Sequence, residues 1–489
     1  MMEDKAISNH SLFTNIAERD KSLIGADKEM GQHIKHSTCT AARTGSGADI
    51  FANERISRLL LRLAPPVMAA QLIQAMYNIV DSFFVGMYSP SALTALSVIY
   101  PIQWLAPAIA LGIGVGVNTY MSKLYAVKNE ARADRTAGTG TALEVAAWTI
   151  YAACVLIFLP AYTRASANGS DVIRDTMIYG RIVCAGSIFQ FLESNWAKVH
   201  QARGNMKTPM IAESLGALTN IIMDPLLIFG AGPIPSLGAA GAAYATVLGQ
   251  FVSAVITCRK ACHKIPSIHE LPKFAVPSLK LGYPTILSQM TMSVYIVILN
   301  MILARFSDSA VTVLGLYYKY QSFFFIPLMG LCTCIVPILS YNHTTGDYRR
   351  CRMTMRDSIL ISAAFMLAGI FCFDAIPEKL LSLFSKEQEV LDAGIPAFRA
   401  IGLSFIPAVF SLMLPVFFQA IGESSKSTML ALCRQIFCLI PSFYLLSLIG
   451  LRWTWFAFPF SETLTGAVGL IMYFTEIRKW SRKSSICQL

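Results

Sequence analysis

Charged side chains are scarce in this sequence. Only 14% of its 489 residues are Asp, Glu, Lys or Arg, whereas a soluble protein carries about 25%. Apolar residues make up 54% of the chain, and they gather in blocks of about 20 residues, the length that crosses a bilayer as a helix. Alternating ten-residue segments, which indicate an outer-membrane barrel, are missing. The composition therefore predicts an all-α, polytopic membrane protein.

Signatures of catalysis and of cofactor binding are also missing. The chain has no Gly-rich loop ending in Lys-Ser/Thr, so we expect no direct use of ATP, and it has neither a His-Glu-x-x-His nor a Gly-x-Ser-x-Gly motif. The 12 cysteines are scattered, and they lack zinc-ligand spacing. No basic stripe interleaved with aromatics suggests a nucleic-acid partner. We expect neither an enzyme nor a resident cofactor or metal.

The apolar blocks predict twelve transmembrane helices in two lobes of six. The spans are expected at residues 63–86, 92–118, 137–160, 176–199, 209–231, 237–258, 281–304, 311–338, 355–375, 395–418, 427–450 and 453–476. The chain then divides into a disordered cytoplasmic tail, a first lobe, a cytoplasmic linker loop, a second lobe and a second cytoplasmic tail, at residues 1–54, 55–258, 259–280, 281–478 and 479–489.

Positive charge predicts the orientation. Loops after even-numbered spans and the C-terminal tail hold roughly 21 Lys and Arg, against roughly 8 on the other face, so both termini should be cytoplasmic. The net charge of +11 fits this topology and the anionic lipid of the inner leaflet. Residues 51–62 are amphipathic and are expected to lie at the membrane surface before the first span. We expect a multi-pass protein of the cell membrane, in a bacterium the inner membrane.

The sequence matches itself without gaps when it is shifted by 218 residues. Because six spans is an even number, both halves should enter the membrane from the same face, as parallel repeats do in transporters. Such a pair encloses a cleft at its interface. The matched residues are Pro66 and Pro284, Gln71 and Gln289, Tyr77 and Tyr295, Tyr100 and Tyr318, Gln103 and Gln321, Gly112 and Gly330, and Arg132 and Arg350.

Two acidic residues break the repeat. Asp81 and Asp224 in the first half correspond to Leu299 and Ser442 in the second. An ionisable side chain inside a membrane by default marks a functional site. Asn220 lies four residues before Asp224 and so shares its helix face. Together with a hydroxyl such as that of Thr246, the two carboxylates would form an oxygen-rich cage for Na⁺, or alternatively would share a proton.

The expected cleft is lined by amphipathic and soft side chains. Aromatic faces attract organic cations, and methionine adapts its shape to many ligands. For the acid Glu462 two alternatives stay open, contact with a cationic substrate and a structural hydrogen bond. Glu193, Lys198 and Glu213 are expected to snorkel or to form a local ion pair. The predicted cleft residues are Gln71, Gln74, Tyr77, Asn78, Tyr100, Gln103, Gln289, Met292, Tyr295, Asn300, Tyr318, Gln321, Met329 and Glu462.

Several motifs are spread along the chain, namely Pro66-x14-Asp81-x4-Gly86, Gln201-Ala-Arg-Gly-Asn205, Asn220-x3-Asp224-Pro225, Pro337-x3-Tyr341-Asn342 and Trp455-x3-Pro459-x2-Glu462. Together they resemble the multidrug and toxic compound extrusion (MATE) transporters. The resemblance covers about residues 55–478 and implies two six-helix lobes and antiport of drugs against H⁺ or Na⁺. By resemblance, the coupling positions are Asp81, Asn220, Asp224 and Thr246, with Asn195 as a further candidate.

The sequence thus predicts a secondary antiporter that exports amphipathic, cationic compounds in exchange for H⁺ or Na⁺ and acts as a monomer. Three alternatives remain. A lipid-linked saccharide flippase would need a larger and more cationic cavity. A major-facilitator antiporter would carry an acidic-basic loop signature after the second span, which is missing here. A non-transporting receptor or scaffold would show no ion-coupled flux.

Overall fold

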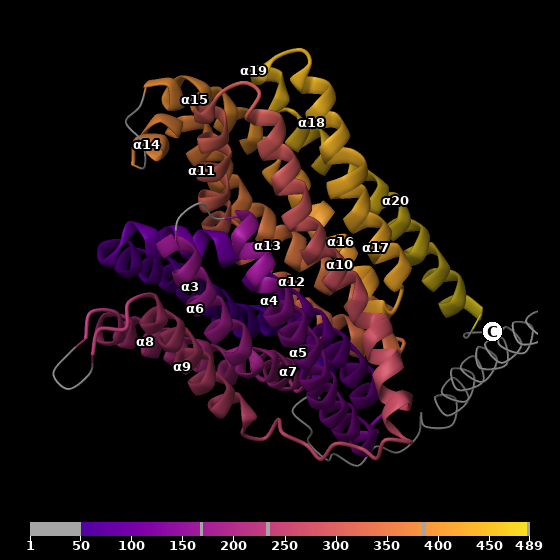
Figure 1. Ribbon diagram of the computed structural model, residues 1–489. Helices are drawn as coiled ribbons and strands as arrows, with labels where there is room; N and C mark the ends of the chain where they lie inside the picture. Colours follow the sequence, from indigo (N-terminus) through magenta and orange to yellow (C-terminus); the bar gives the residue numbers. More distant parts are fainter. Residues whose placement is uncertain (1–49, 167–169, 231–234, 384–387, 487–489) are drawn as a thin grey trace, which may run out of the picture. The chain divides into compact units, whose positions relative to one another are not determined.

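The structure is a computed structural model that describes residues 50–166, 170–230, 235–383 and 388–486 (Figure 1). The tail predicted at residues 1–54 lies outside the described residues up to position 49. Throughout the described ranges the regular structure is helical, which confirms the all-α prediction. The first half consists of α2 Ile50–Asn53, α3 Ile56–Tyr88, α4 Pro90–Ala126, α5 Glu130–Ser166, α6 Ser170–Gly186, α7 Ile188–Ala202, α8 Lys207–Ile228 and α9 Ala239–Cys258.

The second half is more broken than the first. A seven-residue π-helical segment, η2 Cys433–Leu439, lies within one of its spans, and such segments are rare. Its helices are α10 Leu271–Leu303, α11 Asp308–Phe324, α12 Ile326–Thr344, α13 Tyr348–Ala375, α14 Pro377–Ser382, α15 Gln388–Gly402, α16 Phe405–Ile421, α17 Ser424–Leu432, α18 Ile440–Ser447, α19 Leu451–Thr454 and α20 Ala457–Ile486.

Among the described residues, nine helices are long and apolar enough to cross a membrane, or ten if the bent pair α15–α16 counts as one span. The two helices of that pair meet at 54°. The other two predicted spans fall on α6–α7 and on α20, which do not meet this measure of length and apolarity. The chain is therefore a multi-pass helical membrane protein.

Several spans that were predicted as continuous are interrupted. The fourth is divided at Ser187, whose hydroxyl donates to the carbonyl oxygen of Cys184 at 2.8 Å. Serine hydroxyls that bond to the local backbone compete with regular helix geometry. The eighth is divided at Phe325, between α11 and α12. Hydrophobic blocks are continuous at these points, so apolar length alone does not reveal the breaks.

Helix α10 begins ten residues before the predicted start of its span, at Leu271 rather than at 281. Pro272 occupies its first turn, a position where the missing amide hydrogen of proline costs nothing. The additional turns bury Phe274 and Ser278, and α10 packs along α4 of the first half. The linker between the two halves is therefore shorter than the predicted 259–280.

The segment 51–62 is predicted to lie at the membrane surface, and most of its apolar side chains pack against protein. Phe51, Ile56 and Leu59 are fully buried, and α2 and α3 pack against α12 of the second half. The carbonyl oxygen of Phe51 accepts hydrogen bonds from Asn342 at 3.1 Å and from Arg350 at 2.8 Å. Polar contacts to the second half thus fix the start of the first span.

The two halves hold each other through reciprocal contacts. Helix α10 packs on α4, and α3 packs on α12. A Cβ atom on Gly112 would collide with the side chain of Ile286, and one on Gly330 would lie 2.8 Å from Cγ of Met68. These two pairs are related by the 218-residue shift. The sequence repeat therefore reappears as a pair of equivalent contacts between the halves.

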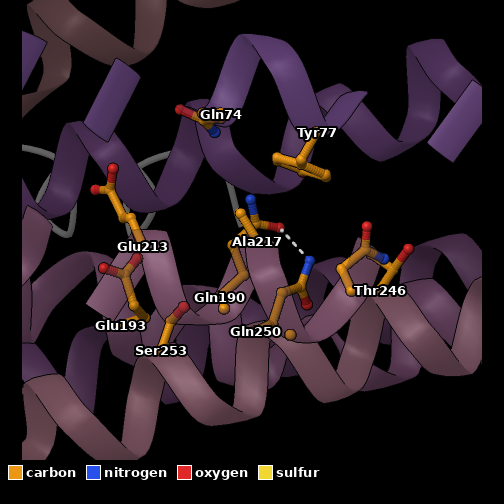
Figure 2. Close-up of a pocket in the computed structure, with 12 residues that line it drawn as sticks. Gln74, Tyr77, Gln190, Glu193, Glu213, Ala217, Thr246, Gln250 and Ser253 are labelled. Atoms are coloured by element: carbon orange, nitrogen blue, oxygen red, sulfur yellow. Dashed lines mark hydrogen bonds between the residues drawn. The ribbon is translucent and has the colours of Figure 1, made fainter. Parts of the chain in front are cut away.

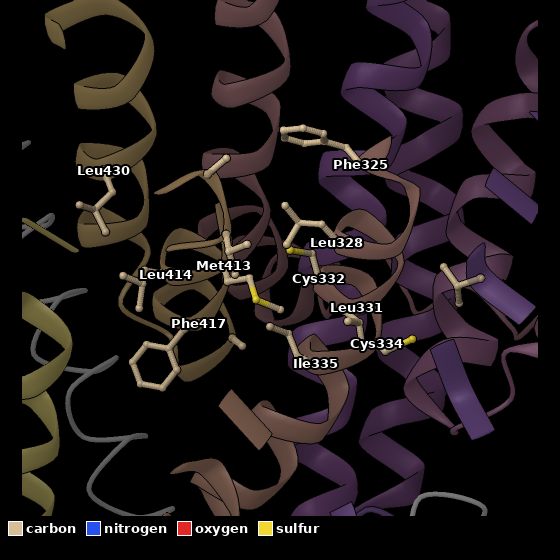
Figure 3. Close-up of a cluster of buried hydrophobic side chains, with 14 of the residues drawn as sticks. Phe325, Leu328, Leu331, Cys332, Cys334, Ile335, Met413, Leu414, Phe417 and Leu430 are labelled. Atoms are coloured by element: carbon tan, nitrogen blue, oxygen red, sulfur yellow. The ribbon is translucent and has the colours of Figure 1, made fainter. Parts of the chain in front are cut away.

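Buried apolar side chains of both halves form one large core cluster. Figure 3 shows part of it, where Leu331 and Ile335 of α12 lie near Met413 and Phe417 of α16. A second cluster lies within the first half and includes Val85, Ile99, Tyr151 and Phe191. The polar residues discussed next lie on helices that these clusters hold in place.

We predict that Gly112→Ala destabilises the packing of α4 on α10. The added methyl group would collide with Ile286, and overpacking of this kind costs about 1–3 kcal/mol. Gly315→Ala is the matched control, because a Cβ on helical Gly315 would have no atom within 4 Å. Thermal unfolding in detergent should show a lower midpoint for the first variant and an unchanged or higher midpoint for the control.

Candidate functional site

Four of the predicted coupling residues come together where α3, α8 and α9 pack on one another. Asp224 is fully buried and Asn220 is 2% exposed. The amide nitrogen of Asn220 donates to Asp224, and with its amide so oriented its oxygen accepts from the backbone N–H of Thr246 at 3.2 Å. The carboxyl groups of Asp81 and Asp224 interact directly. Helices from distant parts of the sequence therefore supply one cluster of oxygens.

Local sequence explains why this cluster is so compact. Asn220 and Asp224 are one helical turn apart, so both side chains point from α8 in the same direction. A Cβ atom on Gly216 would lie 2.7 Å from the carbonyl oxygen of Gly249, so the absence of side chains lets α8 and α9 approach closely. Oδ1 of Asp81 is buried without a hydrogen-bond partner among the described residues, and it is available to a cation.

One member of this neighbourhood is not predicted by the sequence. Tyr179 of α6 is 2% exposed and interacts with Asp81, Thr246 and Gln103. Its position on a different helix, with no regular spacing to the acids, leaves no sequence signal. The predicted residue Asn195 lies elsewhere. It is fully buried on α7, and its amide donates to Thr141 at 3.2 Å and to the carbonyl oxygen of Ala137 at 3.4 Å, both on α5.

A small cavity of about 90 Å³ runs beside this cluster. Figure 2 shows Glu193 and Glu213 at one end of the cavity and Thr246 at the other. Gln74 and Tyr77 of α3 lie across the cavity from these three residues. The two glutamates thus line this cavity. Snorkelling toward the membrane surface was one of the two alternatives that the sequence left open for them. The lining is Gln74, Tyr77, Gln190, Glu193, Glu213, Gly216, Ala217, Asn220, Thr246, Gly249, Gln250 and Ser253.

A larger cavity of about 470 Å³ is lined by side chains of both halves. Among the predicted cleft residues, Gln71, Gln74, Gln289 and Met329 line it. The lining also includes polar side chains that the sequence did not place there, among them Lys198 and Glu213 from the first half and Gln419 and Arg434 from the second. The repeat predicts the paired glutamines correctly, whereas none of the three charged groups has a charged counterpart at the 218-residue shift.

Other predicted cleft residues line neither of these two cavities. Tyr295 is 5% exposed, and its ring lies 6.4 Å from that of Tyr318. Met292 packs on the apolar core, and Tyr100 is 58% exposed beside Trp104. Gln103 interacts with Tyr179. The side chain of Asn78 lies outside the described part of the structure. Asn300 and Gln321 also line neither cavity.

Glu462 forms a buried ion pair with Arg434. Two guanidinium nitrogens of Arg434 donate to Oε1 of Glu462 at 2.9 and 2.7 Å, and Ser411 donates to Oε2. The geometry therefore fulfils the structural alternative that the sequence left open for Glu462. Arg434 lies on η2 with its side chain 15% exposed, against the large cavity, and not in a loop.

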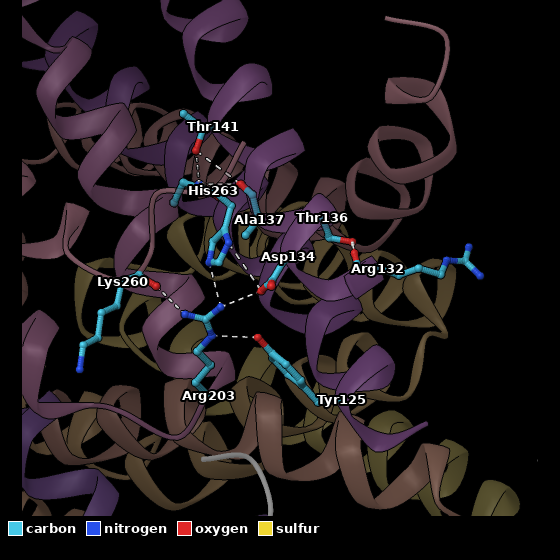
Figure 4. A network of polar contacts seen from close by, with 10 residues as sticks. Tyr125, Arg132, Asp134, Thr136, Ala137, Thr141, Arg203, Lys260 and His263 are labelled. Carbon is cyan, nitrogen blue, oxygen red and sulfur yellow. Dashed lines mark hydrogen bonds and ion pairs between the residues drawn. The ribbon is translucent and has the colours of Figure 1, made fainter. Parts of the chain in front are cut away.

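A polar network ties the linker to the first half at the basic end of the helices (Figure 4). Arg203 donates to Asp134 at 2.9 Å and to the hydroxyl of Tyr125 at 2.8 Å, and it lies 2.8 Å from Nε2 of His263. Its guanidinium also donates to the backbone carbonyl of Lys260. Because Arg203 can only donate, the facing nitrogen of His263 must be an unprotonated acceptor. Nδ1 of His263 lies 3.6 Å from Asp134.

The residues that the structure describes include no group of three or more His, Cys, Asp or Glu placed to hold a metal ion. What the arrangement offers instead is a pair of carboxyl groups with an amide and a hydroxyl inside one half, and a cavity between the halves. Such a combination can bind a small cation at one place and a larger molecule at another.

These features define a polytopic membrane protein with an asymmetric ionisable site on a duplicated scaffold. A family model described as MatE matches the sequence twice, at residues 66–226 and 284–445. The chain belongs to this family, which confirms the resemblance noted in its motifs. The two matches begin 218 residues apart, the same interval as the internal repeat.

Curated relatives are similar over most of their length. A protein of Shewanella oneidensis named FAD transporter is 24% identical over 84% of this chain and 93% of its own. A protein of Staphylococcus aureus named multidrug export protein MepA is 22% identical over 87% of this chain and 95% of its own.

Solved structures share the fold. A MOP superfamily transporter from Pyrococcus furiosus, described as having a binding pocket of reverse polarity, superposes with a TM-score of 0.83 at 21% identity. A multidrug resistance MATE family transporter in an outward-facing conformation gives the same TM-score and identity. Both matches cover 90% of this chain and all of the other chain.

We predict that Glu462→Ala is strongly destabilising. It would leave the charge of Arg434 buried without its partner, which costs about 3–5 kcal/mol. The double variant Arg434→Leu/Glu462→Leu removes both charges and should be milder. Thermal unfolding of both variants in detergent measures the difference. A smaller loss for the single variant than for the double would contradict a structural role for this pair.

We predict that the network around His263 weakens in acid. Partial burial lowers the pKa of His263 below its ordinary 6.5, and Arg203 adds to this, although Asp134 opposes it. A base whose pKa is lower in the folded state loses stability as the pH falls from about 6.5 toward that lowered value. The unfolding midpoint should therefore fall more between pH 7.5 and 5.5 in the wild type than in His263→Gln. Equal falls would argue against the histidine.

Proposed function

We propose that this protein is a secondary antiporter that exports amphipathic, cationic compounds in exchange for H⁺ or Na⁺. The observation that carries the proposal is the separation of two sites. A cluster of buried carboxyl, amide and hydroxyl groups lies within the first half, and a cavity of about 470 Å³ lies between the halves. An exchanger needs both a place for the driving ion and a place for the cargo.

In this proposal Asp81, Asn220, Asp224 and Thr246 hold the coupling cation. A cation that binds between Asp81 and Asp224 removes the repulsion of two close carboxylates. Asp81 is on α3, which also packs on α12 of the second half. A change in charge at Asp81 therefore acts on the same helix that joins the two halves. Asn195 is assigned a supporting role, because it connects α7 to α5 instead of facing the carboxyl pair.

The large cavity is the proposed cargo site. Its amide side chains from both halves, Gln71 and Gln289, hydrogen-bond polar groups of many shapes, and Met329 offers an adaptable apolar surface. We assign the remaining predicted cleft residues to a cleft that opens when the halves separate, since Tyr295 and Tyr318 are packed together in this arrangement.

Twelve transmembrane helices in two lobes, with both termini cytoplasmic, complete the proposal. The two family matches and the paired glycine contacts support the parallel repeat. Contacts between the halves include those of Gly116 with Ser278 and of Phe51 with Tyr341, which lie near the basic loops. If that end is cytoplasmic, as the basic loops indicate, the described arrangement is closed on the cytoplasmic side. We further propose a cell-membrane location and a functional monomer.

The charge of the cavity distinguishes this function from a lipid-linked saccharide flippase. That alternative predicts a strongly cationic cavity, whereas Arg434 is paired with Glu462 and Lys198 interacts with Glu213. The Shewanella oneidensis relative is named FAD transporter, so FAD is one specific anionic cargo to consider. FAD uptake into vesicles should therefore be measured beside ethidium, a cationic probe. Transport of FAD in preference to ethidium would revise the cargo class and leave the coupling site in place.

We predict that Asp224→Asn lowers cation-driven ethidium transport in proteoliposomes at least tenfold, because an amide can neither release a proton nor balance a sodium ion. Asp171→Asn is the matched control, since Asp171 is exposed in the first turn of α6. Gel filtration and thermal unfolding should show that both variants fold. Transport by the Asp224 variant at the wild-type rate would refute the coupling site.

A further inference from the structure

Five residues from Glu213 to Asp224 form a stripe along one face of α8. Glu213, Gly216, Ala217, Asn220 and Asp224 follow at the helical intervals of three and four, which place side chains on one face. With a rise of 1.5 Å per residue, the two acids are about 16 Å apart along the axis. All but Asp224 line the small cavity. The two small residues in the middle leave room that larger side chains would fill.

The Glu213 end of this stripe borders the large cavity between the halves. Glu213 and Gln74 line both the small cavity and the large one. Among the described residues, these two side chains alone are common to both linings. Glu213 therefore occupies the boundary between the neighbourhood of the proposed coupling site and the proposed cargo site.

Glu213 lies within a group of charges on neighbouring helices. Lys198 of α7 interacts electrostatically with Glu213 and Glu193, and its ammonium group donates to Gln201 at 3.0 Å. Oε1 of Glu193 is buried without a hydrogen-bond partner among the described residues. Two carboxylates and one ammonium group would leave a buried negative charge, which is costly. The group is neutral when it carries one additional proton.

Other titratable groups also face this group. Glu144 of α5 interacts with Glu193, Tyr77 of α3 interacts with Glu213, and Cys334 of α12 interacts with Lys198. Glu144 is fully buried, with both carboxyl oxygens unpartnered among the described residues. It does not line the small or the large cavity, so it has no comparable path to the space between the halves.

We propose that Glu193, Glu213 and Lys198 form a second proton-binding station, through which the coupling proton passes between the Asp81–Asp224 pair and the large cavity. The proposal rests on the proposed antiport function and deepens it, because it names H⁺ and not Na⁺ as the coupling ion. The tethered ammonium group of Lys198 repels a metal cation, whereas a proton can exchange on a carboxyl group beside it.

The proton transfers balance without any further reactant. The protonated carboxyl of Glu213 gives its proton to water in the large cavity. The group of Glu193, Glu213 and Lys198 then carries one net negative charge, which favours uptake of the next proton. A proton from the Asp81–Asp224 pair then reloads Glu213 through water in the small cavity, whose volume of about 90 Å³ is large enough to admit water. Each step breaks one O–H bond and forms another.

Glu213→Gln tests the station. In proteoliposomes with an imposed pH gradient, the variant should transport ethidium at least tenfold more slowly than the wild type. The driven rate is expressed relative to ethidium exchange at equal pH on both sides, which needs no net proton movement, because Glu213 also lines the proposed cargo site. Glu213→Asp keeps an ionisable group and should restore at least part of the driven rate. Glu144→Gln is the matched control for loss of a buried glutamate outside the cavities, and it should keep the driven rate.

Ala217→Leu tests the path without touching an acid. The larger side chain would fill the middle of the small cavity and should slow proton-driven transport at least tenfold, with ethidium exchange preserved. Ala217→Ser keeps the space open and should behave as the wild type. Thermal unfolding of each variant in detergent establishes that it is folded. If Ala217→Leu does not fold, the comparison of Glu213→Gln with Glu213→Asp decides the proposal.

Two outcomes would overturn this inference. The first is proton-driven transport at the wild-type rate in Glu213→Gln. The second is wild-type transport driven as strongly by a Na⁺ gradient at uniform pH as by a pH gradient. Asp224→Asn, measured in the same assay, separates the two proposals. If that variant is inactive while Glu213→Gln is fully active, the coupling site stands and only the second station fails.

Discussion

The burial of ionisable groups among apolar helices is the constraint on which the rest of this structure depends. A charge in such surroundings must be balanced by a counter-charge, a proton or a bound cation. Two buried pairs meet this requirement in different ways. Arg434 and Glu462 balance each other permanently, whereas among the described residues no basic group interacts with the pair Asp81–Asp224. The first pair is therefore suited to holding the fold, and the second to exchanging its counter-ion.

The same requirement explains why the repeat is incomplete. Duplication supplies two similar sets of helices, and apolar and amide residues can be kept in both because they cost little. A second buried acid cluster would need a second counter-ion. Leu299 and Ser442 replace the acids in the second half, and Leu299 is fully buried in the apolar core. The residues that the two halves share therefore build the scaffold, and the acids that only the first half carries supply the ionisable site.

Much of the fold and part of the site could be predicted from the sequence. Asp81, Asn220, Asp224 and Thr246 do come together. The sequence could predict this cluster because an acid inside an apolar block has few explanations other than a functional site. Glu213 was missed as a cavity residue, although its position seven residues before Asn220 on the same helix face was a usable signal. Tyr179 and the breaks at Ser187 and Phe325 depend on contacts between distant segments, which a single sequence does not reveal.

The paired contacts of Gly112 with Ile286 and of Gly330 with Met68 limit how the two halves can move. Each large side chain packs against a glycine of the opposite half, where a Cβ atom would collide with it. Because the two contacts are reciprocal, sliding one half along the other would disturb both at once. The two glycines therefore resist sliding between the halves more than they resist a change of tilt.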